Sequence, residues 1–235
     1  MNGSSELEVV DHDYSDVVCL VPVFNEGEVV GNVVTELRRV FDLVVCIDDG
    51  SSDGSGEIAR LSGAHLIRHC VNLGQGGALS TGFRFALNQP NIRYVVTFDG
   101  DGQHRVADAV ALVNRLKCGN LDVVIGTRFA GVEALSMPRS KRAVLRLIIG
   151  IRKIFTKSEF TDIHNGLRAF TTEALGKFEV TQFGMAHASE INQKIRLHKL
   201  RAAEEPVQII YTSYSIRKGQ TLLNGVNVIA ELIWR

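Results

Sequence analysis

The most informative stretch of this chain is Val95-Val96-Thr97-Phe98-Asp99-Gly100-Asp101-Gly102-Gln103-His104. Its apolar half has the character of a buried strand, and this strand delivers two carboxylates onto a glycine-rich turn. Carboxylates this close repel each other unless a cation lies between them, and oxygen ligands suit Mg²⁺ or Mn²⁺. The stretch therefore predicts a metal site at Asp99 and Asp101 that would accept phosphate as a further ligand.

Two other interpretations of this turn have to be weighed. Asp and Gly both favour turns, so an Asp-Gly-Asp-Gly sequence is often only a loop. A calcium loop of the EF-hand type does not fit, because its sixth position would be His104 rather than Gly and its twelfth Val110 rather than Glu. The choice between a loop and a metal site depends on the rest of the chain.

The composition is that of an ordinary globular protein. At 235 residues, with 45% apolar and 22% charged residues, the chain can bury one large core. The net charge is zero, so nothing favours nucleic acid as a partner. Cys19 and Cys46 lie in apolar runs, which indicates buried free thiols in a reducing compartment. Because no signal peptide or transmembrane run is evident, we expect a cytoplasmic protein that is soluble or peripheral on a membrane.

Strand and helix patterns alternate after a polar segment, 1–16, that we expect to be a flexible tail. The expected strands are 17–24, 43–47, 64–68, 93–98, 121–126 and 205–211, the last with Pro206 near its start. The expected helices in the first half are centred on 30–41, 54–62, 77–88 and 106–117. This alternation predicts an α/β fold with a mainly parallel sheet and helices on both faces. Ligands bind such sheets at the carboxyl ends of the strands, where polar residues gather in this chain.

Common nucleotide-binding motifs are absent. The turn at 24–27 lacks G-x-G-x-x-G and the turn at 74–77 does not match it, so a Rossmann dinucleotide site is excluded, and no P-loop is present. Asn25-Glu26 and Asp48-Asp49 instead offer hydrogen-bond acceptors to a ribose or a base. The alternative is that these residues only cap loops.

Four motifs stand in series: Val21-Pro22-Val23-Phe24-Asn25-Glu26, Ile47-Asp48-Asp49-Gly50-Ser51-Ser52-Asp53, Asn72-Leu73-Gly74-Gln75-Gly76-Gly77-Ala78-Leu79 and Asp99-Gly100-Asp101-Gly102-Gln103-His104. In this order and near this spacing, they resemble family 2 glycosyltransferases with the GT-A fold. The resemblance is greatest to the polyprenyl-phosphate branch, which is similar to dolichol-phosphate mannose synthase. It covers roughly residues 17 to 222.

The resemblance implies a GT-A catalytic domain over 17–221, of which 17–128 binds a nucleotide sugar. Asp49 would hydrogen-bond the base, and Asp99, Asp101 and Gln103 would hold Mg²⁺ or Mn²⁺ against the diphosphate. The residues that would contact the nucleotide sugar are Pro22, Phe24, Asn25, Glu26, Asp48, Asp49, Ser51, Gly76, Asp99 and Gly100. Gln75 stands where relatives often carry Lys, so it is assigned no phosphate contact.

The acceptor half would be 129–221. Within it, residues 134–158 carry basic but no acidic residues, and apolar residues recur at helical spacing. Such a basic amphipathic helix is typical of a segment on an anionic membrane or over a phosphate. The alternative is a core-facing helix with a solvated outer face. By resemblance, the residues that hold the acceptor's phosphate are Arg128, Arg139, Arg142, Arg217 and Lys218.

Three carboxylates are the candidate catalytic residues. Asp101 would act through the metal, and Asp162 would orient the sugar or the acceptor. Glu190 would be the general base if the acceptor were a sugar hydroxyl, whereas a phosphate oxygen is already anionic and needs none. His187 and Glu190 can share a helix face, but no third zinc ligand is evident.

The leading hypothesis is a metal-dependent inverting transferase that moves a sugar from UDP or GDP to a polyprenyl phosphate at the cytoplasmic membrane face. A C-terminal amphipathic helix at 222–235 and a small membrane-anchored partner protein would bring it to the membrane, and a homo-oligomer is an open alternative. One rival function is transfer to a saccharide hydroxyl in surface-polysaccharide synthesis. Another is a non-catalytic module that binds nucleotide sugars.

Overall fold

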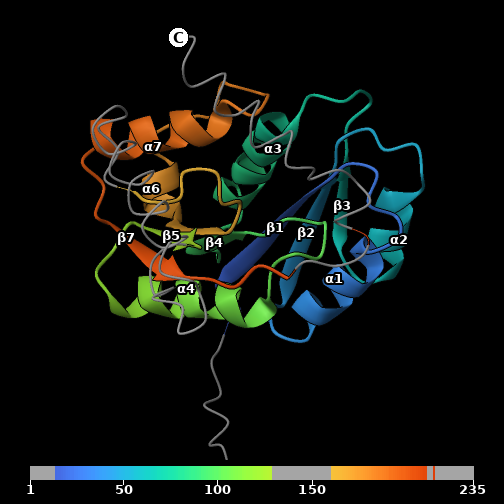
Figure 1. The fold of residues 1–235 in the computed structure, drawn as a ribbon, viewed down its shortest axis with the longest axis horizontal. Helices are drawn as coiled ribbons and strands as arrows, with labels where there is room; N and C mark the ends of the chain where they lie inside the picture. The colour runs from blue at the N-terminus through green and yellow to red at the C-terminus, as the bar shows by residue number, and fades with distance from the viewer. Residues whose placement is uncertain (1–13, 129–159, 211–213, 215–235) are drawn as a thin grey trace, which may run out of the picture.

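The computed structural model describes residues 14–128 and 160–210 together with Tyr214. Their strands form one seven-stranded sheet in the order β3-β2-β1-β4-β6-β5-β7 (Figure 1). The strands are β1 (Val17–Val23), β2 (Leu43–Asp48), β3 (His65–Arg68), β4 (Tyr94–Thr97), β5 (Val123–Thr127), β6 (Arg168–Thr171) and β7 (Ala202–Pro206). β6 runs antiparallel to β4 and β5, and the other pairings are parallel. The expected mainly parallel sheet is confirmed.

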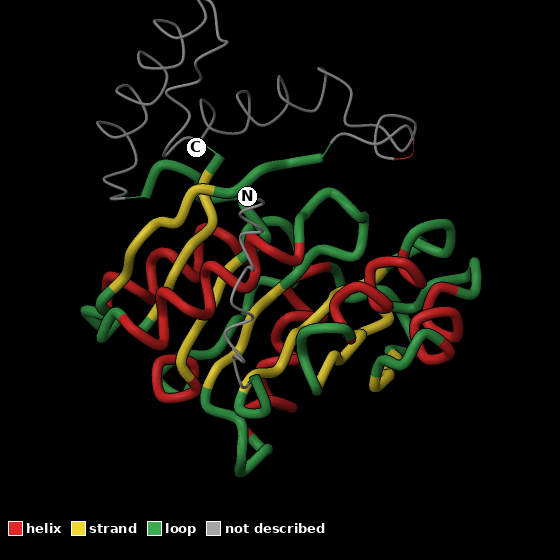
Figure 2. Tube along the Cα trace, turned by 90° about the horizontal axis from the view of Figure 1, so that it is seen from below, coloured by secondary structure: helices red, strands yellow, loops and turns green. Residues whose placement is uncertain are grey.

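Helices cover both faces of the sheet. They are α1 (Val30–Arg38), α2 (Ser55–Leu61), α3 (Gln75–Leu87), α4 (Val106–Cys118), α6 (Thr172–Leu175) and α7 (His187–Leu197). α1, α2 and α4 pack on one face and α3, α6 and α7 on the other (Figure 1). Cys19 of β1 faces the first core and Leu20 the second, which is why this strand is apolar along its whole length. Figure 2 shows the strands twisting across the molecule between the helices.

Two strands differ from the expectation drawn from the sequence. β6 was not expected as a strand, because four residues are too few to show a periodicity. The last strand is Ala202–Pro206 rather than 205–211, so Pro206 ends the strand instead of beginning it. β7 lies at the edge of the sheet and is only half-buried, so its sequence lacks the apolar pattern of the inner strands.

The described fold begins before Val17. Tyr14 is buried, and its hydroxyl donates to Asn114 Oδ1 at 3.0 Å. Lys117 pairs with Asp16 at 2.6 Å, and its ammonium lies 5.3 Å from the centre of the Tyr14 ring. Residues 14–16 are therefore attached to α4, and only residues 1–13 of the expected tail lie outside the described residues.

Several expectations concern residues that the structure does not describe. The basic segment 134–158 with Arg139 and Arg142, the residues Arg217 and Lys218, and the helix at 222–235 all lie outside the described residues. In the part of the chain that is described, no helix is both long and apolar enough to cross a membrane.

Candidate active site

The candidate site lies along the edge of the sheet that is formed by the carboxyl ends of the parallel strands, not along the lateral edge at β7. The segments after β1, β2 and β4 all leave the sheet at this edge. Because β6 is antiparallel, the loop 160–167 that precedes it reaches the same edge. This topology gathers Asp49, Asp99 and Asp162 from distant parts of the sequence, at the edge where open α/β sheets bind ligands.

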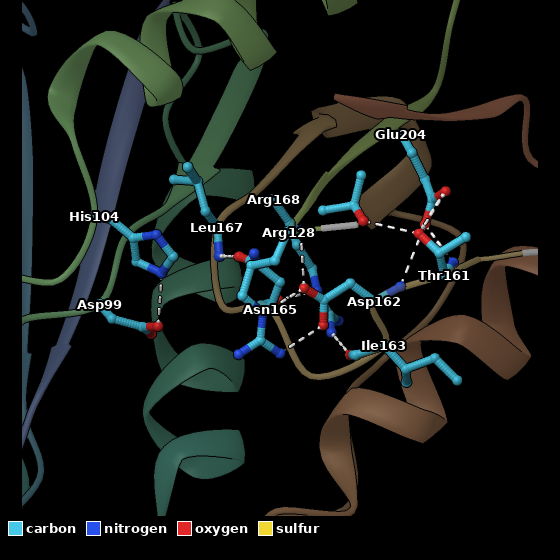
Figure 3. A network of polar contacts seen from close by, with 11 residues as sticks. Asp99, His104, Arg128, Thr161, Asp162, Ile163, Asn165, Leu167, Arg168 and Glu204 are labelled. Atoms are coloured by element: carbon cyan, nitrogen blue, oxygen red, sulfur yellow. Dashed lines mark hydrogen bonds and ion pairs between the residues drawn. The ribbon is translucent and has the colours of Figure 1, made fainter. Parts of the chain in front are cut away.

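Asp99 is held from two sides. Gln75 Nε2 donates to its Oδ1 at 3.0 Å. On the other side, His104 Nε2 lies 3.1 Å from its Oδ2, as Figure 3 shows. Burial raises the pKa of Asp99, but the hydrogen bond from His104 and the charges of His104 and Arg168 outweigh it, so the net pKa is lowered. The carboxylate is therefore a fixed anion at the start of the acidic turn.

Asp101 has the opposite electrostatic character. Its Oδ1 accepts a hydrogen bond from the backbone N–H of Gln103 at 3.0 Å. Burial and the charge of Asp99 raise the pKa of Asp101 to about 6. Gln103 is itself buried, and its carbonyl accepts from the N–H of Ile210 at 2.9 Å. The turn thus holds two carboxylates that repel each other, which a cation would relieve.

Asp99 and Asp101 could hold a divalent cation only together with ligands that a substrate supplies. The described residues contain no cluster of three or more His, Cys, Asp or Glu that could hold a metal on its own. Mg²⁺ is commonly bound by one or two protein carboxylates together with waters and substrate phosphates. Asp99 and Asp101 match this arrangement, and the remaining ligands would come from a diphosphate and water.

The segments after β1 and β2 are hydrogen-bonded into one unit. The N–H of Asn25 donates to Ser51 Oγ at 3.0 Å, and the N–H of Glu26 donates to Ser55 Oγ at 2.8 Å. Tyr214, far along the chain, donates its hydroxyl to Glu26 Oε2 at 2.7 Å. The structure therefore brings together three residues expected at the nucleotide sugar, Asn25, Glu26 and Ser51.

Pro22 and Phe24 flank this unit at the end of β1. Pro22 is half-buried, and its carbonyl oxygen would lie 3.2 Å from a Cβ at Gly100. Phe24 is 44% exposed. These positions place Pro22, Phe24 and Gly100 along the same edge of the sheet, and their contact with a nucleotide sugar remains a prediction.

Asp49 anchors the segment after β3. Its Oδ1 accepts from the N–H of Leu73 at 2.9 Å and lies 2.7 Å from His69 Nδ1, and its Oδ2 accepts from the N–H of Gly74 at 2.7 Å. His69 Nε2 lies 2.9 Å from the hydroxyl of Thr81 on α3. The structure thus gives Asp49 a role in holding the loop, and its expected contact with a base remains a prediction.

Asp48 is buried beneath the loop after β2. Its Oδ1 accepts from the N–H of Ser51 at 2.9 Å, and its Oδ2 lies 3.0 Å from Arg68 Nε. A Cβ at Gly56 would lie 2.3 Å from that Oδ2. These contacts make Asp48 a support of the loop, and an expected nucleotide contact would have to share this carboxylate.

Gly76 has a packing role that the sequence did not reveal. Its N–H donates to the carbonyl of Phe183 at 2.8 Å, and a Cβ there would lie 2.0 Å from the carbonyl oxygen of Gln182. Its N–H is bonded within the protein, and the expected contact between Gly76 and the nucleotide sugar stays a prediction.

Glu190 holds the segment that packs on Gly76. Its carboxylate accepts from the N–H groups of Thr181 and Gln182 at 2.9 and 2.8 Å and from the Thr181 hydroxyl at 2.6 Å. The side chain is buried on α7. Glu190 therefore holds this loop in place, and the role of general base expected from the sequence stays a prediction. His187, on the same helix, hydrogen-bonds the carbonyl of Gly184 through Nδ1 at 2.8 Å.

Arg128 and Asp162 contact each other directly. Arg128 Nε and Nη2 donate to Asp162 Oδ2 and Oδ1 at 2.7 and 2.8 Å, and the backbone N–H of Arg128 adds a third contact at 3.1 Å (Figure 3). Burial raises the pKa of Asp162, but the hydrogen bonds and charge of Arg128 outweigh it and lower the net pKa. Two residues expected to face the acceptor therefore form one ion pair.

Four residues at this edge were given no role from the sequence: Gln75, His104, Gly166 and Arg168. Arg168 is buried, and its Nε and Nη2 donate to the carbonyls of Asn165 and Ile163 at 3.0 and 2.5 Å. Burial lowers its pKa to about 10. A signal was present, because each of these residues lies inside or next to a glycine-containing motif at the end or start of a strand or helix. What the motif could not give was the partner of each side chain.

The mixed sheet, with an acidic turn after β4 and an antiparallel β6 inserted between β4 and β5, is the GT-A fold. The chain belongs to glycosyl transferase family 2, whose family model matches residues 18–179. The family resemblance noted from the four sequence motifs is therefore confirmed.

Similar proteins cover nearly the whole chain. An uncharacterized protein of Methanocaldococcus jannaschii, MJ1222, is 33% identical over 98% of this chain and 95% of its own. The UDP-N-acetylglucosamine–dolichyl-phosphate N-acetylglucosaminyltransferase of Methanococcus voltae is 27% identical over 92% of this chain and 94% of its own. Glucosyl-3-phosphoglycerate synthase from Mycobacterium tuberculosis, solved with Mg²⁺ and uridine diphosphate, is 18% identical with a TM-score of 0.63, over 89% of this chain and 74% of that one. This last likeness concerns the fold.

Proposed function

We propose that this chain transfers a sugar from a nucleoside diphosphate, UDP or GDP, to a polyprenyl phosphate, with inversion at the anomeric carbon. The observation that carries the proposal is the position of the loop 160–167, which reaches Asp99 at Gly166 and pairs with Arg128 through Asp162 (Figure 3). A site for a diphosphate and a site for a second phosphate would then share one edge. The Methanococcus voltae relative is named for a donor and an acceptor of these classes.

The donor would lie over the segments that follow β1, β2 and β4. The hydrogen-bonded unit of Asn25, Glu26 and Ser51 offers polar groups to a ribose or a base. Asp99 and Asp101, with Gln103, would hold Mg²⁺ or Mn²⁺, which when bound neutralises the charge that grows on the departing nucleoside diphosphate. Gln75 and His104 keep Asp99 in place for this role.

The acceptor would lie beside Arg128. A phosphate oxygen is anionic at neutral pH, so it can attack the anomeric carbon without a general base while the bond to the nucleoside diphosphate breaks. The occupied carboxylates of Asp162 and Glu190 are consistent with a reaction that needs no base. A guanidinium binds phosphate well because its planar fork can make two hydrogen bonds.

We also propose that the reaction takes place at the cytoplasmic face of a membrane, because a polyprenyl chain partitions into a bilayer. The basic segment 134–158 and the apolar repeat in 222–235 are the parts of the sequence that support this location.

The test is a transfer assay with the purified chain, Mn²⁺, radiolabelled UDP- and GDP-sugars, and farnesyl phosphate as a short polyprenyl phosphate. We expect one donor to give a labelled farnesyl-phosphate sugar, and EDTA to abolish the product. Asp101→Asn should lose both the product and the Mn²⁺-dependent thermal shift with UDP, while Glu57→Gln, an exposed pair with Arg60, keeps both. Transfer to a saccharide but not to farnesyl phosphate would overturn the acceptor assignment. Full activity of Asp101→Asn would overturn the metal assignment.

A further inference from the structure

The carboxylate of Asp162 is enclosed within the protein. Its side chain is 1% exposed, and both of its oxygens contact Arg128. The side chain of Arg128 is 41% exposed, so the cation of the pair faces the solvent side and the anion lies behind it. We propose that Asp162 is a positioning residue: it sets the orientation of the Arg128 guanidinium, and Arg128 meets the acceptor's phosphate. This inference rests on the proposed function.

Asp162 is fixed by contacts that do not involve Arg128. The preceding residue, Thr161, donates its N–H and its hydroxyl to the carboxylate of Glu204 on β7. The Thr161 hydroxyl also lies 2.8 Å from the hydroxyl of Thr127 on β5 (Figure 3). Two neighbouring strands therefore hold the backbone next to Asp162 independently of the arginine. A preorganised partner of this kind orders a flexible side chain at low entropic cost.

The two parallel hydrogen bonds between Arg128 and Asp162 determine which edge of the guanidinium faces the carboxylate. Asp162 takes up the edge formed by Nε and Nη2, and it also accepts the backbone N–H of Arg128, so the residue is bound at both ends. Bidentate pairing fixes the plane of the guanidinium as well as its position. A lysine at 128 or an asparagine at 162 cannot reproduce this geometry, because neither preserves two parallel N–H to oxygen bonds between opposite charges.

The same strand offers a matched control. Asp122 comes just before β5, so it lies at the amino-terminal end of this strand, whereas Arg128 follows the carboxyl end. Asp122 accepts from Arg201 Nε and Nη2 at 3.0 and 2.9 Å and from the Arg201 backbone N–H at 2.7 Å. This pair repeats the contacts of Arg128 and Asp162 but lies away from the candidate site. Asp122→Asn therefore removes an ion pair of the same geometry, whose carboxylate is 14% exposed against 1% for Asp162, without touching the acceptor side.

The experiment compares Asp162→Asn, Asp162→Glu, Arg128→Lys and the double variant Asp162→Asn/Arg128→Lys, with Asp122→Asn as the control. With the active donor and farnesyl phosphate, we expect Asp162→Asn to raise the KM for farnesyl phosphate about ten-fold, with the donor KM and the shape of the pH profile unchanged. When Arg128→Lys is already present, Asp162→Asn should not raise the KM for farnesyl phosphate further, because Asp162 is proposed to act on the acceptor only by orienting Arg128. Asp122→Asn should keep the wild-type KM.

Two kinetic results would overturn the proposal. Loss of the acidic limb of the kcat profile with an unchanged KM for farnesyl phosphate would make Asp162 a catalytic base. An equal effect of Asp162→Asn in both backgrounds would show that it does not act through Arg128. If Asp162→Asn fails to fold, Asp162→Glu takes its place, because it keeps the charge and displaces the carboxylate by one methylene. It is expected to raise the same KM.

A second measurement separates this inference from the proposed function. Hydrogen exchange of the Arg128 Nε–H, followed by NMR, reports the Arg128–Asp162 pairing in the absence of any nucleotide sugar. The binding of farnesyl phosphate is measured separately by calorimetry. Protection of the Nε–H in the wild type that falls in Asp162→Asn supports the positioning role, whereas unchanged protection overturns it. Absence of farnesyl phosphate binding to the wild type overturns the proposed acceptor, and the exchange data still report on the pairing.

Discussion

The carboxylate of Asp99 occupies the space that a side chain at Gly166 would need. A Cβ at Gly166 would lie 2.2 Å from Asp99 Oδ2 and 2.3 Å from Oδ1. The acidic turn after β4 and the loop before β6 therefore touch at this point. Glycine is required here for space, since its backbone is not in the left-handed region.

Gly166→Ala tests this contact. The methyl group has to displace either Asp99 or the loop 160–167, so we expect the Kd for UDP in the presence of Mn²⁺ to rise about ten-fold, with a stability loss of about 1–3 kcal/mol from overpacking. Calorimetry and urea unfolding measure the two effects. Gly184→Ala is the control, because a Cβ there meets nothing within 4 Å. A wild-type Kd in Gly166→Ala would show that Asp99 does not depend on this contact.

Asp49→Asn tests whether Asp49 holds the loop after β3. The substitution places an amide NH₂ against one of the donors from His69, Leu73 and Gly74, so we expect a stability loss of about 1–3 kcal/mol in urea unfolding. The exposed Asp53 gives a comparison, since Asp53→Asn also removes a carboxylate that bonds a loop. A stability loss for Asp49→Asn no larger than that of Asp53→Asn would contradict the anchoring role.

Glu190→Gln gives a pH-dependent result. Burial raises the pKa of Glu190, but the hydrogen bonds from Thr181 and Gln182 outweigh it, so the folded-state pKa is below its ordinary value of 4.5. The carboxylate therefore stabilises the fold above that value, and this contribution is lost as the pH falls through the folded-state pKa.

We expect Glu190→Gln to be less stable than the wild type by about 1–2 kcal/mol at pH 7, and the difference to shrink below about pH 4. Urea unfolding across this range provides the measurement. A difference that stays constant from neutral to acidic pH would mean that the charge of Glu190 contributes nothing.

The thiols should react in two classes. Cys70 and Cys118 are exposed, whereas Cys19 and Cys46 are free and buried, as the sequence indicated. Burial raises the pKa of both inner thiols, and that of Cys46 to about 12, so their reactive thiolates are scarce. With a thiol reagent at pH 8, Cys70 and Cys118 should be modified in the native protein, and Cys19 and Cys46 only after denaturation. Mass spectrometry of the labelled peptides distinguishes the outcomes, and labelling of Cys46 in the native state would contradict its burial.

Local patterns in the sequence were enough to place the first strands and helices. Continuous apolar runs such as 17–23 and 43–47 indicate strands that are buried on both faces, because no alternation of polar and apolar residues is needed there. The motifs that follow these strands mark the edge of the sheet where ligands bind. The family and the fold followed from the same motifs and were confirmed. These features depend on neighbours within a few residues of each other, so the sequence alone determined them.

The tertiary structure decided which groups each polar side chain meets. Arg128 and Asp162 are 34 positions apart and meet because β6 is inserted between β4 and β5, a position that no periodicity encodes. Gly166 faces Asp99 for the same reason. Whether a carboxylate is a base, a ligand or a support depends on the donors that reach it, and those donors come from loops and helices whose positions are fixed by the packed sheet.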